Sequence, residues 1–311
     1  MGPRPGRQTL RIGMALGDIT GRPGTVDEIV DEARVAVDAG FPSLWCAQVF
    51  VYDALTLLAL IGREVPGAEL GTFVVPTYPR HPVMLASQAL TVQAACGNRL
   101  VLGLGLSHQL VIEGMFGYSF DKPARHMREY LTALVPLLRG EQVSVEATGW
   151  SANAQVRVPS ADAPSVLIAA LAPRMLQLAG TLADGTLTWM TGPSTLANHI
   201  VPSIAKAAAD AGRPSPRVVA GLPICVSADP AAAREQAAKR FSVYDHLPSY
   251  RAMLDHEGAA GPADVAIVGD EAAVTAQLRS IADAGATDFV AAPFGSSAER
   301  QRTVDVLASM R

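Results

Sequence analysis

The segment Thr25-Val-Asp-Glu-Ile-Val-Asp-Glu-Ala-Arg-Val-Ala-Val-Asp-Ala-Gly-Phe-Pro-Ser-Leu-Trp-Cys-Ala47 contains the repeating structural unit of this chain. Its first four residues form a capping-box sequence, which typically opens a helix. From Val26 to Val37 apolar residues recur at spacings of three and four, so the expected helix has one apolar face. Gly40 is the residue type that commonly ends a helix. The apolar run at 43–47 then predicts a short buried strand.

The same helix-to-strand pattern returns near the C-terminus, where Asp283-Ala-Gly285 precedes Thr287-Asp-Phe-Val-Ala291. A helix that ends in Ala-Gly and leads into a short buried strand is typical of parallel α/β proteins. Strands of this kind are predicted at 10–16, 43–47, 69–75, 99–106, 165–170, 184–190, 217–226 and 286–292. This number of β/α units over 311 residues favours an α/β fold of the (β/α)8 TIM-barrel type, as one domain over 1–311. An open doubly wound sheet with a small second domain is the alternative.

Two connections exceed ordinary loop length and are predicted to be insertions. Residues 107–122 follow the fourth strand, and residues 243–268 follow the seventh. Long connections after barrel strands lie at the C-terminal rim, where barrel enzymes carry their active sites. Residues 1–9 have no apolar pattern of this kind, so we expect them to be a flexible lead-in rather than a signal peptide.

Composition narrows the class of protein. Hydrophobic residues make up 49% of the chain and charged residues 17%, which excludes general disorder. The net charge of −4 gives no reason to expect nucleic-acid binding. The sequence contains no run of about 18 apolar residues, so it does not predict a membrane-spanning helix. The three cysteines are far apart and match no disulfide framework or metal pattern. We therefore expect a cytoplasmic protein.

Several kinds of catalytic site have no matching motif. The sequence lacks an HExxH motif, a GxSxG nucleophile elbow and a GxxxxGK[ST] phosphate loop. It also has no tight carboxylate pair at a strand end, so we expect no dedicated metal site. If the protein is an enzyme, an organic cofactor must carry the reaction of a small-molecule substrate.

Candidate site residues follow the third and fourth strands. Prolines stiffen the segment 71–82, in which His81 fits a surface or capping position. In the fourth strand, Gly103 and Gly105 leave one face without side chains, so a flat ligand or another stretch of backbone can approach closely. His108 emerges at the rim, where it is equally suited to proton transfer or ligand contact and to a buried structural role.

Two further features follow the fifth and sixth strands. The run Val166–Ala170 leads directly into Leu171-Ala-Pro-Arg174, which opens a helix. Small residues there leave backbone N–H groups free, so this helix start is a candidate anion site. Trp189 ends the next strand and could form an aromatic wall over a cofactor or simply fill the barrel.

Three segments taken together resemble the bacterial-luciferase-like superfamily: Gly71-Thr-Phe-Val-Val-Pro-Thr-Tyr-Pro-Arg-His-Pro82, Leu100-Val-Leu-Gly-Leu-Gly-Leu-Ser-His108 and Ala183-Asp-Gly-Thr-Leu-Thr-Trp189. The resemblance extends from Leu10 to about Leu307. Within the superfamily, the chain is similar to oxidoreductases that use the deazaflavin coenzyme F420. The stretch 114–130 is typical of one subgroup.

The resemblance implies a cofactor site made largely of backbone. It implies a non-prolyl cis peptide between Phe73 and Val74 behind the ring, with Thr72 and Val75 flanking it. Leu106, Ser107 and His108 would lie along the ring edge and the ribityl chain. The segment from Ala170 through Leu171, Ala172 and Arg174 to Met175 would hold the phosphate.

The chain departs from the family at Gln48 and Val49, where many F420-dependent relatives carry an acidic residue followed by histidine. Gln48 can hydrogen-bond the polar edge of the ring, but it cannot act as a general base. We therefore assign any proton transfer to His108, with Tyr52 and Glu113 as weaker candidates.

The predicted function is hydride transfer between F420 and a small organic substrate. An FMN-dependent monooxygenase of the same superfamily is one alternative, because both cofactors occupy the same pocket. A barrel that binds a flavin or F420 without turnover is the other, and the loss of the acidic residue and histidine at 48–49 is its support. The family also implies a homodimer formed through helices beside the second and third strands. The candidate interface residues, which are equally suited to packing against the barrel, are Leu55, Leu57, Leu58, Ile61, Met84 and Leu90.

Overall fold

The computed structural model describes residues 10–17 and 24–310, so the lead-in expected at 1–9 lies outside the described residues. Eight parallel strands form a closed barrel. They are β1 (Arg11–Leu16), β2 (Ser43–Cys46), β3 (Glu69–Thr72), β5 (Leu100–Gly105), β8 (Ser165–Ala169), β9 (Gly185–Trp189), β10 (Arg217–Val226) and β12 (Asp288–Pro293). The barrel closes because β12 pairs with both β10 and β1. The TIM barrel predicted from the sequence is confirmed.

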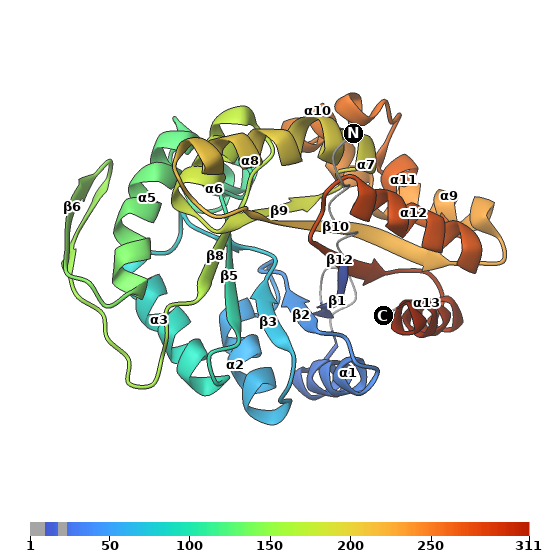
Figure 1. The fold of residues 1–311 in the computed structure, drawn as a ribbon, viewed down its shortest axis with the longest axis horizontal. Helices are drawn as coiled ribbons and strands as arrows, with labels where there is room; N and C mark the ends of the chain where they lie inside the picture. The colour runs from blue at the N-terminus through green and yellow to red at the C-terminus, as the bar shows by residue number, and fades with distance from the viewer. Residues whose placement is uncertain (1–9, 18–23, 311) are drawn as a thin grey trace, which may run out of the picture.

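Helices surround this barrel on its outside (Figure 1). They are α1 (Val26–Asp38), α2 (Ala54–Glu64), α3 (Pro82–Ala95), α5 (Pro123–Leu138), α6 (Pro173–Leu182), α8 (Val201–Asp210), α9 (Pro230–Arg240), α12 (Glu271–Asp283) and α13 (Ser297–Ser309). The first of them begins as the sequence predicts. The Thr25 hydroxyl accepts from the Glu28 N–H at 3.2 Å, and the Glu28 carboxylate accepts from the Thr25 N–H at 2.7 Å. Gly40 ends this unit with a φ of +84°, a conformation that favours glycine.

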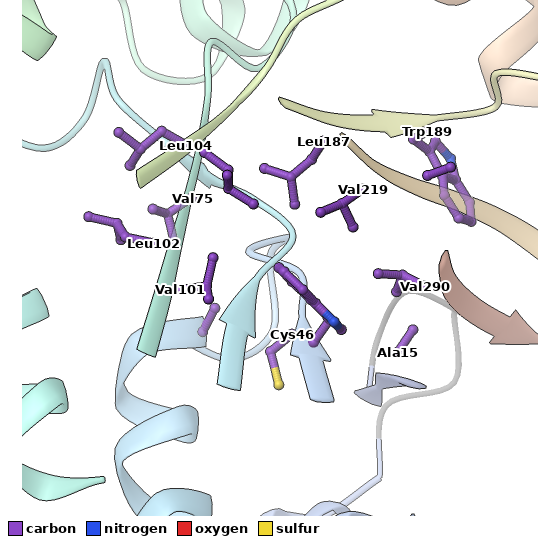
Figure 2. Packing of buried hydrophobic residues seen from close by; sticks show 14 of the residues in the cluster. Ala15, Cys46, Val75, Val101, Leu102, Leu104, Leu187, Trp189, Val219 and Val290 are labelled. Carbon is purple, nitrogen blue, oxygen red and sulfur yellow. The ribbon is translucent and has the colours of Figure 1, made fainter. Parts of the chain in front are cut away.

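The N-terminal end of the barrel is closed by charged side chains. Arg217 pairs with Glu69 and with Asp288, each at 2.6 Å, and its guanidinium lies 5.7 Å from the ring centroid of Trp45. Figure 2 shows buried apolar side chains gathered between the strands, including Leu187 and Val290. Because side chains fill this end and the interior, a ligand can reach the strands only at their C-terminal ends.

The structure contains elements that the sequence reasoning did not predict. An antiparallel hairpin of β6 (Val143–Ala147) and β7 (Trp150–Ala154) precedes β8, and a short strand, β11 (Ile267–Gly269), pairs with β10. The pattern Val-Ser-Val-Glu-Ala of β6 alternates apolar and polar residues, as in a half-exposed strand. A search for continuous buried runs misses such a strand, and β11 is too short to show any periodicity.

The two long connections contain helices. The first carries α4 (Gln109–Gly114). The second lies after α9, not directly after the strand, and carries η3 (Ser242–Asp245), α10 (Pro248–Glu257) and α11 (Pro262–Val265). Between β9 and α8 the chain forms α7 (Pro193–Thr195) and a π-helix, η2 (Leu196–Ile200). In Figure 1, α10 and α7 lie on the same side of the barrel.

The side chains suggested for a dimer interface mostly belong to the core of this chain. Leu55, Leu57, Leu58, Ile61 and Leu90 are buried, so they pack against the barrel, which was the other reading of the sequence. Met84 differs, because it is 66% exposed.

Candidate active site

The third barrel strand is interrupted where the site begins. After β3 the chain passes through a cis peptide between Phe73 and Val74, as the family resemblance implied, and then forms β4 (Val75–Pro76) against β5. The ring of Phe73 packs edge-on between two tryptophans, with its centroid 6.1 Å from that of Trp45 and 6.3 Å from that of Trp189. The break thus directs Phe73 toward the C-terminal end of the barrel interior.

The glycines of the neighbouring strand make room for this interrupted segment. A Cβ atom at Gly103 would overlap the Thr72 carbonyl oxygen, and one at Gly105 would lie 2.5 Å from Val74 Cγ2. Thr72 also exchanges hydrogen bonds with Gly103, since its hydroxyl donates to the carbonyl at 2.7 Å and accepts from the N–H at 2.8 Å. Of the two readings made from the sequence, the close approach of the chain itself accounts for these glycines.

A cavity of about 930 Å³ opens at the C-terminal ends of the strands. Predicted site residues that line it are Gln48, Phe73, Val74, Ser107, His108 and Trp189. Aromatic and apolar side chains of the two long connections also line it: Leu110, Val111, Phe116, Val243, Tyr244, Leu247 and Tyr250. Phe241, which follows α9, and the basic side chains of Arg80 and Arg240 are part of the same lining. The cavity therefore gathers residues at or just beyond the ends of β2, β3, β5 and β9, together with side chains of the two long connections.

His108 is the titratable predicted residue that the structure places in this cavity. Its ring lies 5.6 Å from the ring of Tyr250, measured between centroids. Burial lowers the pKa of His108 below its ordinary value, so the imidazole is neutral at pH 7. Burial also raises the pKa of Tyr250, with a further contribution from Tyr244, and keeps that phenol protonated. A neutral imidazole in an aromatic cavity can accept a proton from a substrate.

Gln48 is held in place by three hydrogen bonds, one of them from another residue that lines the cavity. Its side-chain oxygen accepts from the Ala54 N–H at 2.9 Å and from the Arg80 guanidinium at 3.3 Å, and its Nε2 donates to the Tyr52 carbonyl at 3.3 Å. Arg80 also pairs with Asp53, which caps α2. Burial opposes ionisation of Asp53, but hydrogen bonds from Thr56 and the charge of Arg80 outweigh it and lower the pKa.

Arg80 lines the cavity, and the sequence reasoning did not select it. The available signal was its position: Arg80 follows the β4 strand end in the stiffened 71–82 segment. The neighbouring His81 does cap α3, because its side chain accepts from the Val83 N–H at 3.3 Å.

The two weaker proton-transfer candidates do not line this cavity. The Tyr52 hydroxyl donates to the Gly24 carbonyl at 2.9 Å. The Glu113 carboxylate accepts from the Gln109 side chain at 3.0 Å and from the Phe120 N–H at 3.2 Å. Both groups therefore hold loop structure together at the places where the structure puts them.

Five further predicted cofactor contacts do not line this cavity. Thr72 and Val75 are fully buried behind the Phe73–Val74 segment, Leu106 is half-buried, and Ala170 is buried at the end of β8. Leu171 is half-buried, and its carbonyl oxygen lies 2.7 Å from His199 Nε2.

A second cavity, of about 1050 Å³, lies between the start of α5 and helix α6, along which it extends from Ala172 to Leu182. Of the predicted phosphate contacts, Ala172, Arg174 and Met175 line it. The basic side chains in its lining are Lys122, Arg125, Arg128 and Arg174, and the lining contains no acidic residue. Helix α6 begins at Pro173, and its N-cap residue, Ala172, offers no side-chain cap. Unpaired N–H groups at a helix start and nearby cations both favour an anion.

The structure describes residues 10–17 and 24–310, and what it shows of metal and membrane sites concerns those residues. In that part of the chain, no group of three or more His, Cys, Asp or Glu side chains could hold a metal ion. No helix there has the length and apolarity to cross a membrane. Cys46, Cys96 and Cys225 are buried free thiols.

Comparison with known proteins gives matches over most of the chain. A 5,10-methylenetetrahydromethanopterin reductase of Methanolobus tindarius is 30% identical over 221 residues, covering 70% of this chain and 66% of the reductase, just under two thirds of its length. An F420-dependent secondary alcohol dehydrogenase solved with an F420–acetone adduct has a TM-score of 0.82 at 16% identity, covering 97% of this chain and 98% of the dehydrogenase.

A second solved structure of the same fold binds a different cofactor. The oxygenating constituent of 3,6-diketocamphane monooxygenase from Pseudomonas putida, in complex with FMN, has a TM-score of 0.79 at 15% identity over 97% of each chain. The family model described as luciferase-like monooxygenase matches residues 11–291. The chain therefore belongs to the luciferase-like monooxygenase family.

Proposed function

We propose that this protein is a coenzyme F420-dependent oxidoreductase that transfers a hydride between the deazaflavin and a small organic substrate. Family membership and the F420-dependent dehydrogenase of the same fold support this proposal. The observation that carries it is the combination of two cavities. An aromatic cavity lies at the barrel mouth, and a cavity with four basic side chains in its lining lies along α6 and includes the start of that helix.

The residues present fit the parts of such a cofactor. The volume of the first cavity, about 930 Å³, lies in the range of small-molecule sites. Trp189 lines that cavity, and its buried Nε1–H has no hydrogen-bond partner among the described residues. A buried donor without a partner is costly unless a ligand satisfies it. At the start of α6, unpaired N–H groups and Arg174 suit a phosphate.

The chemistry divides between the cofactor and the chain. When bound, the deazaflavin supplies a ring carbon that accepts or gives a hydride. Phe73, Val74 and Trp189 present apolar surface to the ring and exclude water from it. A ring nitrogen of the neutral His108 accepts the proton of a substrate hydroxyl when an alcohol is oxidised, and returns it in the reverse direction.

The charge of the second cavity favours F420 over FMN. Both cofactors carry a phosphate, but F420 continues beyond it into an acidic polyglutamate tail. Lys122, Arg128 and Arg174 have no ion-pair partner among the described residues, and Arg125 has only Glu129, at 3.8 Å. Four cations exceed what a single phosphate needs, whereas they match a phosphate followed by several carboxylates.

An FMN-dependent monooxygenase remains the second candidate, because a protein of this fold binds FMN and the family model carries that name. The two candidates are separated by titrating the purified apoprotein with each cofactor. We expect F420 to bind at least about tenfold more tightly than FMN, equivalent to about 1.4 kcal/mol. Tight FMN binding without measurable F420 affinity would overturn the proposal.

Turnover is tested separately from binding. Reduced F420 mixed with enones, imines and ketones should be oxidised in the presence of at least one substrate class. Binding of F420 without oxidation by any of them would favour the third reading, a barrel without turnover.

Two further proposals concern the state of the protein in the cell. We propose a homodimer in which the exposed Met84 of α3 takes part, and light scattering would detect it. The free thiols suit the cytoplasm, where we place the protein.

A further inference from the structure

Helix α10 lines the aromatic cavity directly and is connected to the loop before α6 through one intervening segment. Near its start, Tyr250 lines the aromatic cavity and contacts His108. Its last two residues, His256 and Glu257, contact the segment that contains α7 and η2. That segment in turn contacts the loop before α6, through His199.

His199 holds the chain immediately before the anion-binding helix start. Its Nε2 lies 2.7 Å from the carbonyl oxygen of Leu171. A carbonyl oxygen can only accept a hydrogen bond, so Nε2 carries the proton and donates. His199 belongs to the π-helix η2, a rare geometry that is frequent at functional sites.

Two residues at the end of α10 support His199. The ring of His256 stacks on that of His199, with centroids 4.9 Å apart and an interplanar angle of 12°. The Glu257 carboxylate accepts from the N–H groups of Ser194 and Thr195 at 3.0 and 2.7 Å, and from the Thr195 hydroxyl at 2.6 Å. These contacts attach the helical segment carrying His199 to α10.

The hydrogen bond to Leu171 determines the direction of the next N–H group. In a trans peptide the C=O and the N–H point to opposite sides. With the Leu171 oxygen held by His199, the Ala172 N–H points away from His199. If this carbonyl were released, its oxygen could turn toward a bound anion and repel it.

We infer that His199, supported by His256, is a positioning residue for the anion site formed by Ala172, Arg174 and Met175. By holding the Leu171 carbonyl it keeps the free N–H groups at the start of α6 available to a phosphate. This inference rests on the proposed function, because it takes the cofactor phosphate as the anion. Neither histidine lines either cavity described above, so the effect on the cofactor is indirect.

The test compares a phosphorylated ligand with a phosphate-free one. Dissociation constants of the apoprotein for F420 and for its phosphate-free riboside are measured by fluorescence titration. For H199A we expect the Kd for F420 to rise about tenfold, equivalent to about 1.4 kcal/mol, while the Kd for the riboside changes less than about twofold. H199Q keeps an N–H donor and should recover most of the affinity for F420.

Two other variants complete the design. N198A changes the adjacent, exposed residue, whose side chain bonds Ser194 and not Leu171, so it should leave both constants unchanged. H256A keeps the hydrogen bond to Leu171 but removes its support, and we expect a rise of about threefold for F420 alone. Because H256A alters an exposed side chain, it also provides the test if H199A fails to fold.

The outcomes distinguish the inference from the function on which it rests. If H199A or H256A weakens both ligands equally, or weakens neither, the positioning role is wrong. If the wild-type protein binds neither ligand, the proposed function fails and the inference fails with it. If the wild type binds F420 and the riboside equally, no phosphate is held at this site and the positioning role is likewise overturned.

Discussion

The ring centroids of His108 and Tyr250 lie 5.6 Å apart, and the two residues come from the two long connections that line the cavity at the barrel mouth. This relationship places a titratable group under an aromatic cover. Burial lowers the pKa of His108, so the group is ready to accept a proton at neutral pH. The proposed chemistry depends on this neutral form.

His108→Asn should therefore slow the chemical step more than it weakens binding. We expect the single-turnover rate of alcohol oxidation to fall about 100-fold, the usual contribution of a general base. The Kd for F420 should change by less than about threefold. In the wild type, the rate should decline only below about pH 6.5, the ordinary pKa of histidine. His246→Asn is the control, since His246 does not line the cavity. An unchanged rate in H108N would show that another group carries the proton.

Asp53 connects the stability of α2 to the geometry of the cavity. It caps α2 through the Thr56 N–H at 2.8 Å and pairs with Arg80, which in turn bonds Gln48. Asp53→Ala should lower the free energy of unfolding by about 1–2 kcal/mol through the lost cap and the unpaired Arg80. It should also weaken F420 binding, because Arg80 and Gln48 lose their orientation.

Asp270→Ala provides the matched control for this prediction. Asp270 caps α12 in the same way, with its carboxylate accepting from the Ala273 N–H at 2.8 Å, and it does not line the cavity. Its replacement should cost about 1 kcal/mol of stability and leave F420 affinity unchanged. Urea unfolding and cofactor titration of both variants give the comparison. Equal F420 affinities in the two variants would contradict the role of Asp53.

Local patterns in the sequence predicted the barrel well because each β/α unit repeats them. The capping box at Thr25, the glycine at position 40 and the buried runs are properties of neighbouring residues. The hairpin of β6 and β7 was missed because its apolar residues alternate with polar ones. In a strand with this alternating pattern only every second residue is apolar, so a criterion based on continuous apolar runs does not detect it.

The site was harder to predict because the role of each side chain depends on its hydrogen-bond and ion-pair partners in the folded chain. Glu113 and Tyr52 have suitable chemistry, but Phe120 and Gly24 engage them away from the cavity. Arg80 lies in the proline-stiffened segment 71–82, but the contacts with Asp53 and Gln48 that hold it at the cavity rim come from other parts of the chain. Such contacts join residues far apart in the chain, so no local pattern reports them.

Because the second cavity is lined by basic side chains, we predict that the affinity for F420 depends on the acidic tail of the cofactor. Arg125→Ala combined with Arg128→Ala removes two of its four cations. We expect the Kd for F420 to rise about tenfold at low salt, and the effect to shrink in 0.5 M NaCl because salt screens exposed charges. FMN, which has no such tail, should be affected less than about twofold.

Arg139→Ala is the control for that double variant. Arg139 follows the last residue of the same helix, α5, and does not line the basic cavity. Its replacement should leave F420 affinity unchanged at all salt concentrations. A similar loss of FMN and F420 affinity in the double variant would show that the two arginines act on the phosphate and not on the tail.

His126 predicts how the stability of the fold responds to acid. Its ring stacks on that of Tyr78 at 3.9 Å between centroids, and its Nε2 lies 3.0 Å from the Thr77 hydroxyl. Burial lowers its pKa to about 4, although the charge of Glu129 acts in the opposite direction. Between pH 6.5 and pH 4 the unfolded chain therefore binds a proton that the folded protein does not.

It follows that the contribution of His126 to stability is complete above pH 6.5 and is lost as the pH falls toward 4. The ring is partly exposed, so we expect the free energy of unfolding to fall by about 1–2 kcal/mol between pH 7 and pH 4.5, which is less than the full difference between the two pKa values would give.

His126→Phe keeps an aromatic ring on Tyr78 but cannot titrate. At pH 7 it should be about 1 kcal/mol less stable, because the buried Thr77 hydroxyl loses its partner. Its free energy of unfolding should then fall less than that of the wild type on acidification. Urea unfolding at both pH values measures this difference, with His246→Gln expected to follow the wild type, and an identical acid loss in H126F would exclude His126 as its source.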